Sequence, residues 1–237
     1  MDARTESLFA NRLLKAMPPP SLERLQAHFE PVELTRRQVL YSSGERADAI
    51  YFVGRGLVSL VKPMQDGRSM EVSVVGAEGA VCLSSILGLG EALLDSVVHI
   101  PGHAVRIKSA VFREELGRDG AVRDLAMRYA ELTLGQLSQT SACNGLHRLD
   151  QRCCRWLLTA HDNAGADTFP LTHEFLALML GVQRPGVTLA AGALQKAGLI
   201  AYRNGQVSIL DRAGLEGCAC ECYGAMRGLQ ERLFGPA

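Results

Sequence analysis

The sequence predicts an α+β chain: an N-terminal β-roll, then a long helix, then a helix-turn-helix followed by a β-hairpin. Three observations support this order. Short valine-rich segments broken by glycine fill residues 32–107, a proline-free helical pattern runs from about residue 109 to 141, and two short amphipathic helices precede an Asn-Gly turn. We expect a β-roll domain with a helical lead-in over residues 1–108, a long dimerisation helix over 109–144, and the helix-turn-helix domain over 145–237.

Composition sets limits on the function. The 237 residues are 47% hydrophobic and 21% charged, an ordinary globular balance, and the formal net charge is zero. Zero net charge excludes a wholly basic nucleic-acid coat protein, although it allows a domain with a local basic surface. No apolar run reaches the roughly 18 residues of a membrane helix, and the N-terminus lacks the pattern of a signal peptide. We therefore expect a cytoplasmic protein with no membrane partner.

The first domain has the pattern of an antiparallel sheet. The run from Met70 to Val74 alternates apolar and polar residues, as a half-buried strand does. Before it, Asp66-Gly67 is typical of a tight hairpin turn. Many short strands with frequent turns favour a closed or sandwiched sheet.

The long helix carries an apolar stripe at alternating spacings of three and four residues. A helix of roughly 30 residues would be about 45 Å long, more than a small domain needs for its own core. Such a stripe is typical of a coiled-coil seam with a second copy of the chain, so we predict a homodimer. The alternative is a helix that packs only on its own β-domain. The predicted interface residues are Val122, Leu125, Tyr129, Leu132 and Gln136.

The helix-turn-helix is predicted from its end signals. Thr172 is a suitable N-cap, and Gly181 stands where the first helix needs a positive φ. Pro185 fits the first turn of the second helix, where its missing N–H costs nothing. Residues 198–209 then read as strand, Asn204-Gly205 turn and strand, which together with the helices predicts a winged helix.

The chain resembles the Crp/Fnr family of transcription regulators over nearly its whole length. The resemblance rests on Gly44-Glu45, Ala49-Ile50-Tyr51-Phe52-Val53 and Gly56 in the first domain, and on Leu171-Thr172, Glu174, Leu176-Ala177, Leu180-Gly181-Val182, Arg184, Val187, Leu194 and Gly198-Leu199-Ile200 in the last. It implies a cyclic-nucleotide-binding-like jelly roll as sensor and a DNA-binding winged helix. It also implies a regulator rather than an enzyme, which agrees with the absence of catalytic motifs such as His-Glu-x-x-His.

By this resemblance, Thr172 meets a DNA phosphate and Arg184 reads a guanine. Pro185 and Leu189 depart from residues that many members use to read bases, so a different operator is expected. The expected partners are double-stranded DNA with a palindromic operator, a second copy of the chain and RNA polymerase. The predicted DNA-contacting residues are Thr172, His173, Gln183, Arg184, Gly186, Thr188, Lys196, Arg203 and Asn204, with Gln183, Gly186 and Thr188 on one exposed face.

The resemblance does not extend to a cyclic-nucleotide site. The position of the ribose-binding glutamate falls on Ala80 or Val81 in the stretch 78–85, and the phosphate-binding arginine falls near residues 95–98, where Asp95 would repel a phosphate. We predict no cofactor and an unknown effector other than cyclic AMP. An iron–sulfur cluster near the N-terminus lacks ligands, because no cysteine precedes Cys82. For haem, the candidate axial ligands are His28, His99 and His103, although such histidines are more often surface residues.

The seven cysteines predict mainly reduced structural thiols. Cys218, Cys220 and Cys222 are candidate redox thiols, since Cys218 and Cys222 would share one face of a helix. They stand too close together for a tetrahedral zinc site unless another element supplies ligands, so no metal is predicted. Three hypotheses remain: a homodimeric regulator that responds to a signal, a β-roll that has lost its ligand on a constitutive DNA binder, and a thiol-based redox regulator.

Overall fold

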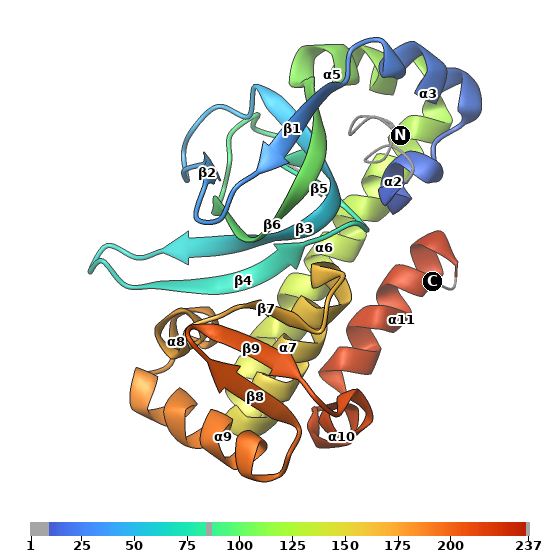
Figure 1. Cartoon of the computed structure of the whole chain (residues 1–237). Helices are drawn as coiled ribbons and strands as arrows, with labels where there is room; N and C mark the ends of the chain where they lie inside the picture. The colour runs from blue at the N-terminus through green and yellow to red at the C-terminus, as the bar shows by residue number, and fades with distance from the viewer. Residues whose placement is uncertain (1–9, 84–86, 236–237) are drawn as a thin grey trace.

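The computed structural model describes residues 10–83 and 87–235. A β-roll and a winged helix-turn-helix lie at opposite ends, and one long helix, α6, runs along both (Figure 1). The C-terminal helix α11 lies beside α6, on which it packs. The predicted α+β order of roll, long helix and winged helix is confirmed. Ser84 and Ser85, at the end of the stretch compared with a nucleotide-binding cassette, lie outside the described residues.

The roll is one antiparallel sheet with strand order β1-β6-β3-β4, on which β2 pairs with β6 and β5 with β3. Its interior is filled by valine, alanine and leucine side chains with Tyr41. Gly67 has φ +82° in the turn that joins β3 to β4, as the predicted hairpin requires. The elements are α2 (Arg12–Lys15), α3 (Pro19–Gln26), β1 (Glu30–Leu34), β2 (Val39–Tyr41), β3 (Ala49–Pro63), β4 (Ser69–Val75), β5 (Ala80–Val81) and β6 (Asp95–Lys108).

The predicted single long helix is two helices, α5 (Ser109–Arg118) and α6 (Gly120–Leu146). The chain bends at Asp119, which is extended (φ −121°, ψ 112°) and caps α6 by accepting a hydrogen bond from the N–H of Ala121. A local cap with a glycine beside it therefore outweighs the continuous helical pattern.

Two residues separate α6 from α7, the first helix of the C-terminal domain. The recognition pair of helices is followed by the two strands of the wing, and a short strand, β7, pairs with β9. The elements are α7 (Leu149–Ala164), β7 (Thr168–Pro170), α8 (His173–Leu180), α9 (Arg184–Lys196), β8 (Ile200–Arg203), β9 (Gln206–Ile209), α10 (Arg212–Cys218) and α11 (Cys222–Phe234).

The two end domains share a hydrophobic core. Leu57, Val61 and Ile100 of the roll belong to the same buried cluster as the apolar faces of α7 and α8. At this junction Trp156 donates its Nε1–H to Oε1 of Glu71 at 2.8 Å. His99, only 1% exposed, stacks on the ring of Phe175 with centroids 4.1 Å apart. The expectation of a surface residue is therefore wrong for His99, because the winged helix covers this part of the roll.

Among the described residues, no single helix is long and apolar enough to span a membrane. Helices α8 and α9 reach the length and apolar composition of a membrane span only when taken together, and the chain bends by 110° between them.

Candidate nucleic-acid interface

The helix pair α8 and α9 is fixed by the end signals that the sequence predicts. Oγ1 of Thr172 accepts the N–H of Phe175 at 3.2 Å and so caps α8. Gly181 has φ +62° and ends α8. Pro185 lies in the first turn of α9. The two helices meet at a 110° bend, within the range of a DNA-binding helix-turn-helix.

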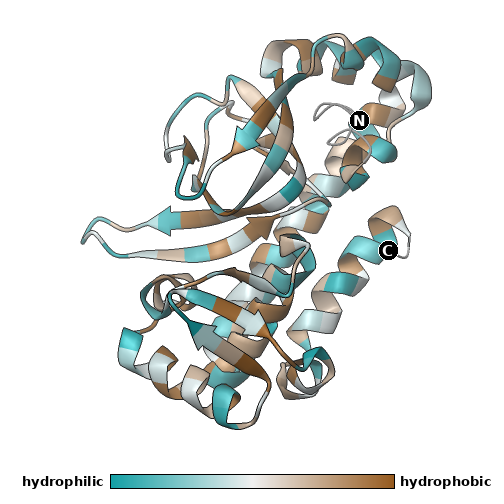
Figure 2. Ribbon diagram, viewed as in Figure 1, coloured by the Kyte–Doolittle hydropathy of each residue, from teal (hydrophilic) through white to brown (hydrophobic). Residues whose placement is uncertain are grey.

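One side of α9 packs into the domain and the other is open. Val187, Ala191 and Leu194 are buried in the domain, and Figure 2 shows hydrophilic and hydrophobic residues mixed along α9. Arg184 and Leu189 are exposed, Leu189 at 78%. The remaining exposed residues of this helix that were predicted to contact DNA are Thr188 and, at its last turn, Lys196, while Gln183 is exposed at its N-cap.

Two predicted contact residues lie differently from the expectation. A Cβ on Gly186 would meet the side chain of Leu149 at 3.0 Å, so Gly186 faces α7 rather than the open side, and its assignment to the exposed face is wrong. Nδ1 of His173 lies 3.1 Å from Oγ1 of Thr188, and its ring packs edge-on against Tyr202. Burial, together with the charge of Arg184, lowers the pKa of His173. A neutral His173 therefore joins α8 to α9 and adds no positive charge for a phosphate.

The wing is a two-residue hairpin. Asn204 and Gly205 have φ +51° and +74°, the signs of a type I′ turn, which the Asn-Gly pair predicts. The carbonyl of Gly205 accepts the N–H of Leu171 at 3.0 Å, so the tip of the wing lies next to the start of α8. Arg203 and Asn204 are exposed there. Because Oγ1 of Thr172 accepts a hydrogen bond within the cap, its own O–H stays available as a donor beside the wing.

The stripe of α6 that was predicted to form the dimer interface faces the chain's own roll. Its five residues are at most 7% exposed within a single chain. The hydroxyl of Tyr129 accepts the N–H of Ala80 at 2.9 Å and lies 3.2 Å from its carbonyl oxygen. The assignment of this face to the dimer interface is wrong, because it packs on the chain's own roll, as the alternative expected. The five residues are Val122, Leu125, Tyr129, Leu132 and Gln136.

The nucleotide position inside the roll is apolar. Ala80 and Val81, which stand where a glutamate would bind a ribose, are 4% and 0% exposed and form β5. Among the described residues of the roll no lysine or arginine is buried, whereas Glu71 and Glu78 are. Burial raises the pKa of Glu71 to about 7 and also raises that of Glu78. This interior offers no positive charge to a cyclic phosphate.

A cavity of about 370 Å³ lies instead between the roll and the C-terminal domain. It is lined by residues of β4, α6, α7, α10 and α11, many of them charged. Glu71 of the roll faces it together with Arg155, Asp162 and Arg212 of the C-terminal domain. Arg212 also forms an ion pair with Asp162 at 2.7 Å. A small molecule bound here would contact the roll and the DNA-binding domain together.

The three candidate redox thiols are not grouped as predicted. α10 ends at Cys218 and α11 begins at Cys222, so the segment is not one helix and the two residues share no face. Cys218 is exposed, whereas Cys220 and Cys222 are buried near Cys143, which the sequence reasoning left out. The sequence signal that could have singled out Cys143 is its spacing of four residues from His147, which places both residues on the same side of a helix end.

Two family models match the chain and together cover well over half of it. The model of the cyclic nucleotide-binding domain matches residues 31–119, and that of the Crp-like helix-turn-helix domain matches residues 151–218. No curated protein sequence matches the chain.

Several solved structures share the fold. FixK2 from Bradyrhizobium japonicum superposes with a TM-score of 0.69 and 19% identity over 81% of this chain and 98% of its own. The c-di-GMP-responsive global regulator CLP from Xanthomonas campestris has a TM-score of 0.65 and 18% identity over 81% and 99%. TTHB099, a transcriptional regulator of the CRP family from Thermus thermophilus, has a TM-score of 0.63 and 24% identity over 79% and 96%. With both domain models matched in the order of the fold, the chain belongs to the Crp/Fnr family, whose members are transcription regulators and not enzymes.

Proposed function

We propose that this regulator is a homodimer that reads a specific operator through α9 and responds to a signal other than cyclic AMP. The observation that carries the proposal is the open face of α9, where Arg184 is exposed in the first turn. A guanidinium in this place suits bidentate hydrogen bonds to O6 and N7 of guanine.

The rest of the α9 face supports readout of a different sequence from that read by many relatives. Leu189 is 78% exposed although leucine gains from burial, and an apolar side chain in the major groove suits the methyl group of thymine. Thr188 and Gln183 add hydrogen-bonding groups nearby, while Arg203 on the wing suits a phosphate.

The dimer interface that we propose is the opposite side of α6 from the predicted one. Met127 and Leu134 are 56% and 64% exposed there. With Ala130, Leu137 and Ser141 they repeat at spacings of three and four residues, the pattern of a two-helix seam. A two-fold axis along this face would place two α9 helices side by side and match a palindromic operator.

The signal is proposed to be other than cyclic AMP because the roll interior is apolar and no lysine or arginine is buried among the described residues of the roll. No cofactor is part of this proposal. A constitutive DNA binder whose roll has lost its ligand is the second candidate, and the filled interior favours it. A small molecule that raises the unfolding temperature by binding the cavity between the domains would decide for the first candidate. We also propose RNA polymerase as a partner, since a regulator at its operator acts through it.

Selection of bound DNA from a random double-stranded pool tests the DNA readout. We expect enriched sites with two inverted half-sites, with centres about 10 base pairs apart, and an affinity that falls steeply as salt rises. A protein that binds no double-stranded DNA in a salt-sensitive way would contradict the proposal.

Replacement of Leu134 by Asp tests the dimer. A carboxylate in the seam would move the dimer–monomer equilibrium toward monomer by more than about tenfold, measured by analytical ultracentrifugation. The matched control is Leu93→Asp in the roll, since Leu93 is similarly exposed at 60%. A dimer that withstands Leu134→Asp, or dissociates equally with Leu93→Asp, would contradict this interface.

A further inference from the structure

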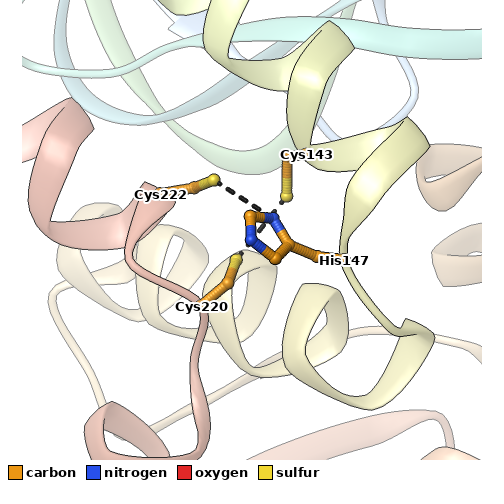
Figure 3. Close-up of side chains that lie close together, drawn as sticks. All are labelled: Cys143, His147, Cys220 and Cys222. Atoms are coloured by element: carbon orange, nitrogen blue, oxygen red, sulfur yellow. Dashed lines mark hydrogen bonds between the residues drawn. The ribbon is translucent and has the colours of Figure 1, made fainter.

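Three buried thiols and one imidazole meet where the long helix joins the C-terminal domain. Cys143 lies in the last turn of α6, whose C-cap is His147, while Cys220 lies in the link between α10 and α11 and Cys222 begins α11 (Figure 3). The cysteines are 0%, 4% and 0% exposed and form a cluster separate from the three apolar cores. His147 is 18% exposed, so the group can be reached from solvent on one side.

The distances within this group are those of ligands around one ion. One ligand atom from each of the four residues lies within 4.8 Å of the other three. Sγ of Cys143 lies 3.6 Å from Sγ of Cys220, and Sγ of Cys222 lies 3.5 Å from Nδ1 of His147. A regular tetrahedron with Zn–S bonds of about 2.3 Å has edges of about 3.8 Å. A four-iron cluster binds each of its cysteines on a different iron, which separates their sulfurs more widely.

The surroundings orient these ligands. Nε2 of His147 lies 3.1 Å from a carboxylate oxygen of Glu221, so it serves as the donor and Nδ1 is left to face the sulfurs. A histidine that binds a metal with one nitrogen and a carboxylate with the other is a recurrent arrangement. Gln139 donates its Nε2–H to Sγ of Cys222 at 3.0 Å, as amides near metal thiolates do.

Two buried arginines supply the charge that such a site needs. Arg152 and Arg155 are 7% and 6% exposed, and neither forms an ion pair within 4.0 Å in the part of the chain that the structure describes. A divalent ion held by three thiolates and a neutral imidazole carries one net negative charge. A negatively charged metal centre would compensate these cations.

We propose that Cys143, His147, Cys220 and Cys222 form a tetrahedral site for one zinc-like divalent ion. All three thiols lose their protons on binding, and the ion joins the last turn of α6 to the link between α10 and α11. The ion thereby ties the helix that lies along the sensor to the DNA-binding domain. The proposal is independent of the operator and of the effector.

Metal analysis of the full-length protein, purified under reducing conditions, tests this site without any DNA. We expect one equivalent of Zn²⁺ per chain after loading with zinc, and after exchange with Co²⁺ the absorption of a tetrahedral thiolate complex. Chelation should lower the unfolding temperature, and zinc should restore it. Iron with labile sulfide, or less than about one tenth of an equivalent of zinc with no cobalt spectrum, would overturn the proposal.

Variants assign the ligands. Cys143→Ser is expected to lose the cobalt thiolate absorption, whereas Cys218→Ser, an exposed cysteine two residues from the site, should keep it. Glu221→Ala should weaken zinc binding about 10- to 100-fold while leaving the four ligands in place. Equal metal loss in Cys218→Ser, or full binding in Cys143→Ser, would overturn the assignment. If Cys143→Ser does not fold, alkylation of the wild-type protein provides the test. Cys143, Cys220 and Cys222 should react more slowly with the alkylating reagent in the zinc-loaded protein than in the chelator-treated protein.

Discussion

The winged helix and the β-roll both belong to binding-domain families, but only one of them presents a recognisable binding surface. The winged helix buries one side of α9 and exposes Arg184 and, on its hairpin, Arg203. The roll instead turns apolar side chains such as Val81 and Val98 into its interior, where a nucleotide would need an arginine. Membership of a domain family therefore carries the fold, whereas the ligand has to be read from the residues at the site.

The two domains meet at a junction that is itself sensitive to charge. Glu71 of the roll accepts the Trp156 hydrogen bond, and its Oε2 has no partner among the described residues. His99 lies between Trp156 and Phe175 and is kept uncharged, because burial and the charge of Arg36 lower its pKa to about 3.

Among the substitutions, the largest expected effect is that of Glu71→Gln on the pH dependence of stability, because burial raises the pKa of Glu71 from 4.5 to about 7. Between these values the folded state binds more protons than the unfolded one, so this carboxyl makes stability fall as pH rises, by about 3 kcal/mol across the window. The Glu71→Gln variant has no ionisable carboxyl at this position and so lacks this pH dependence of stability. Denaturant unfolding at pH 4.5 and pH 7 should show wild type losing about 3 kcal/mol relative to the variant.

His99 has the opposite sign and serves as the control. Its pKa is lowered, so its contribution is lost as pH falls from about 6.5 toward 3. The stability of Glu71→Gln should therefore rise with pH up to about 6.5. Parallel profiles for wild type and Glu71→Gln would show that the roll and the winged helix are not packed together around this carboxyl.

The next effect concerns recognition by α9. Arg184→Ala should cost about 1–3 kcal/mol of specific affinity, roughly 5- to 150-fold, and relax one position in each half-site. Fluorescence anisotropy with the selected operator measures it. Arg46→Ala is the control, since Arg46 is 83% exposed but on the roll, and it should bind normally. Equal losses in both variants would mean that DNA contacts the roll as well.

A smaller effect is expected at the wing. Arg203→Ala should weaken binding about equally for specific and random DNA, because a phosphate contact carries no sequence information. The plot of log affinity against log salt should become shallower by about 1. A loss confined to the specific operator would instead place Arg203 against a base.

The smallest effect is expected for cyclic AMP. A ligand at 100 times its dissociation constant stabilises a protein by about 2.7 kcal/mol, so millimolar cyclic AMP would raise the unfolding temperature if the roll bound it with micromolar affinity. We expect no shift, since the described roll interior buries no arginine or lysine. A clear rise in the unfolding temperature would contradict this prediction, because it would show that the roll binds cyclic AMP.

Much of the geometry of the helix-turn-helix and its wing could be predicted from the sequence because its signals are local. The cap at Thr172, the positive φ at Gly181 and the Asn204-Gly205 turn each depend on a few neighbouring residues. The exception is Gly186, whose open side is taken by Leu149 from another helix. His173 likewise contacts Thr188 of α9, which a pattern within α8 does not reveal.

The order of the domains and the local geometry of the winged helix follow from the sequence, since capping, turn preference and hydrophobic period act between near neighbours. The buried side of α6 follows only from packing, because both the stripe through Leu125 and that through Leu134 have apolar residues at the same spacing. So does the contact of Cys143 with Cys220, since side chains 77 residues apart in the sequence are brought together by packing alone.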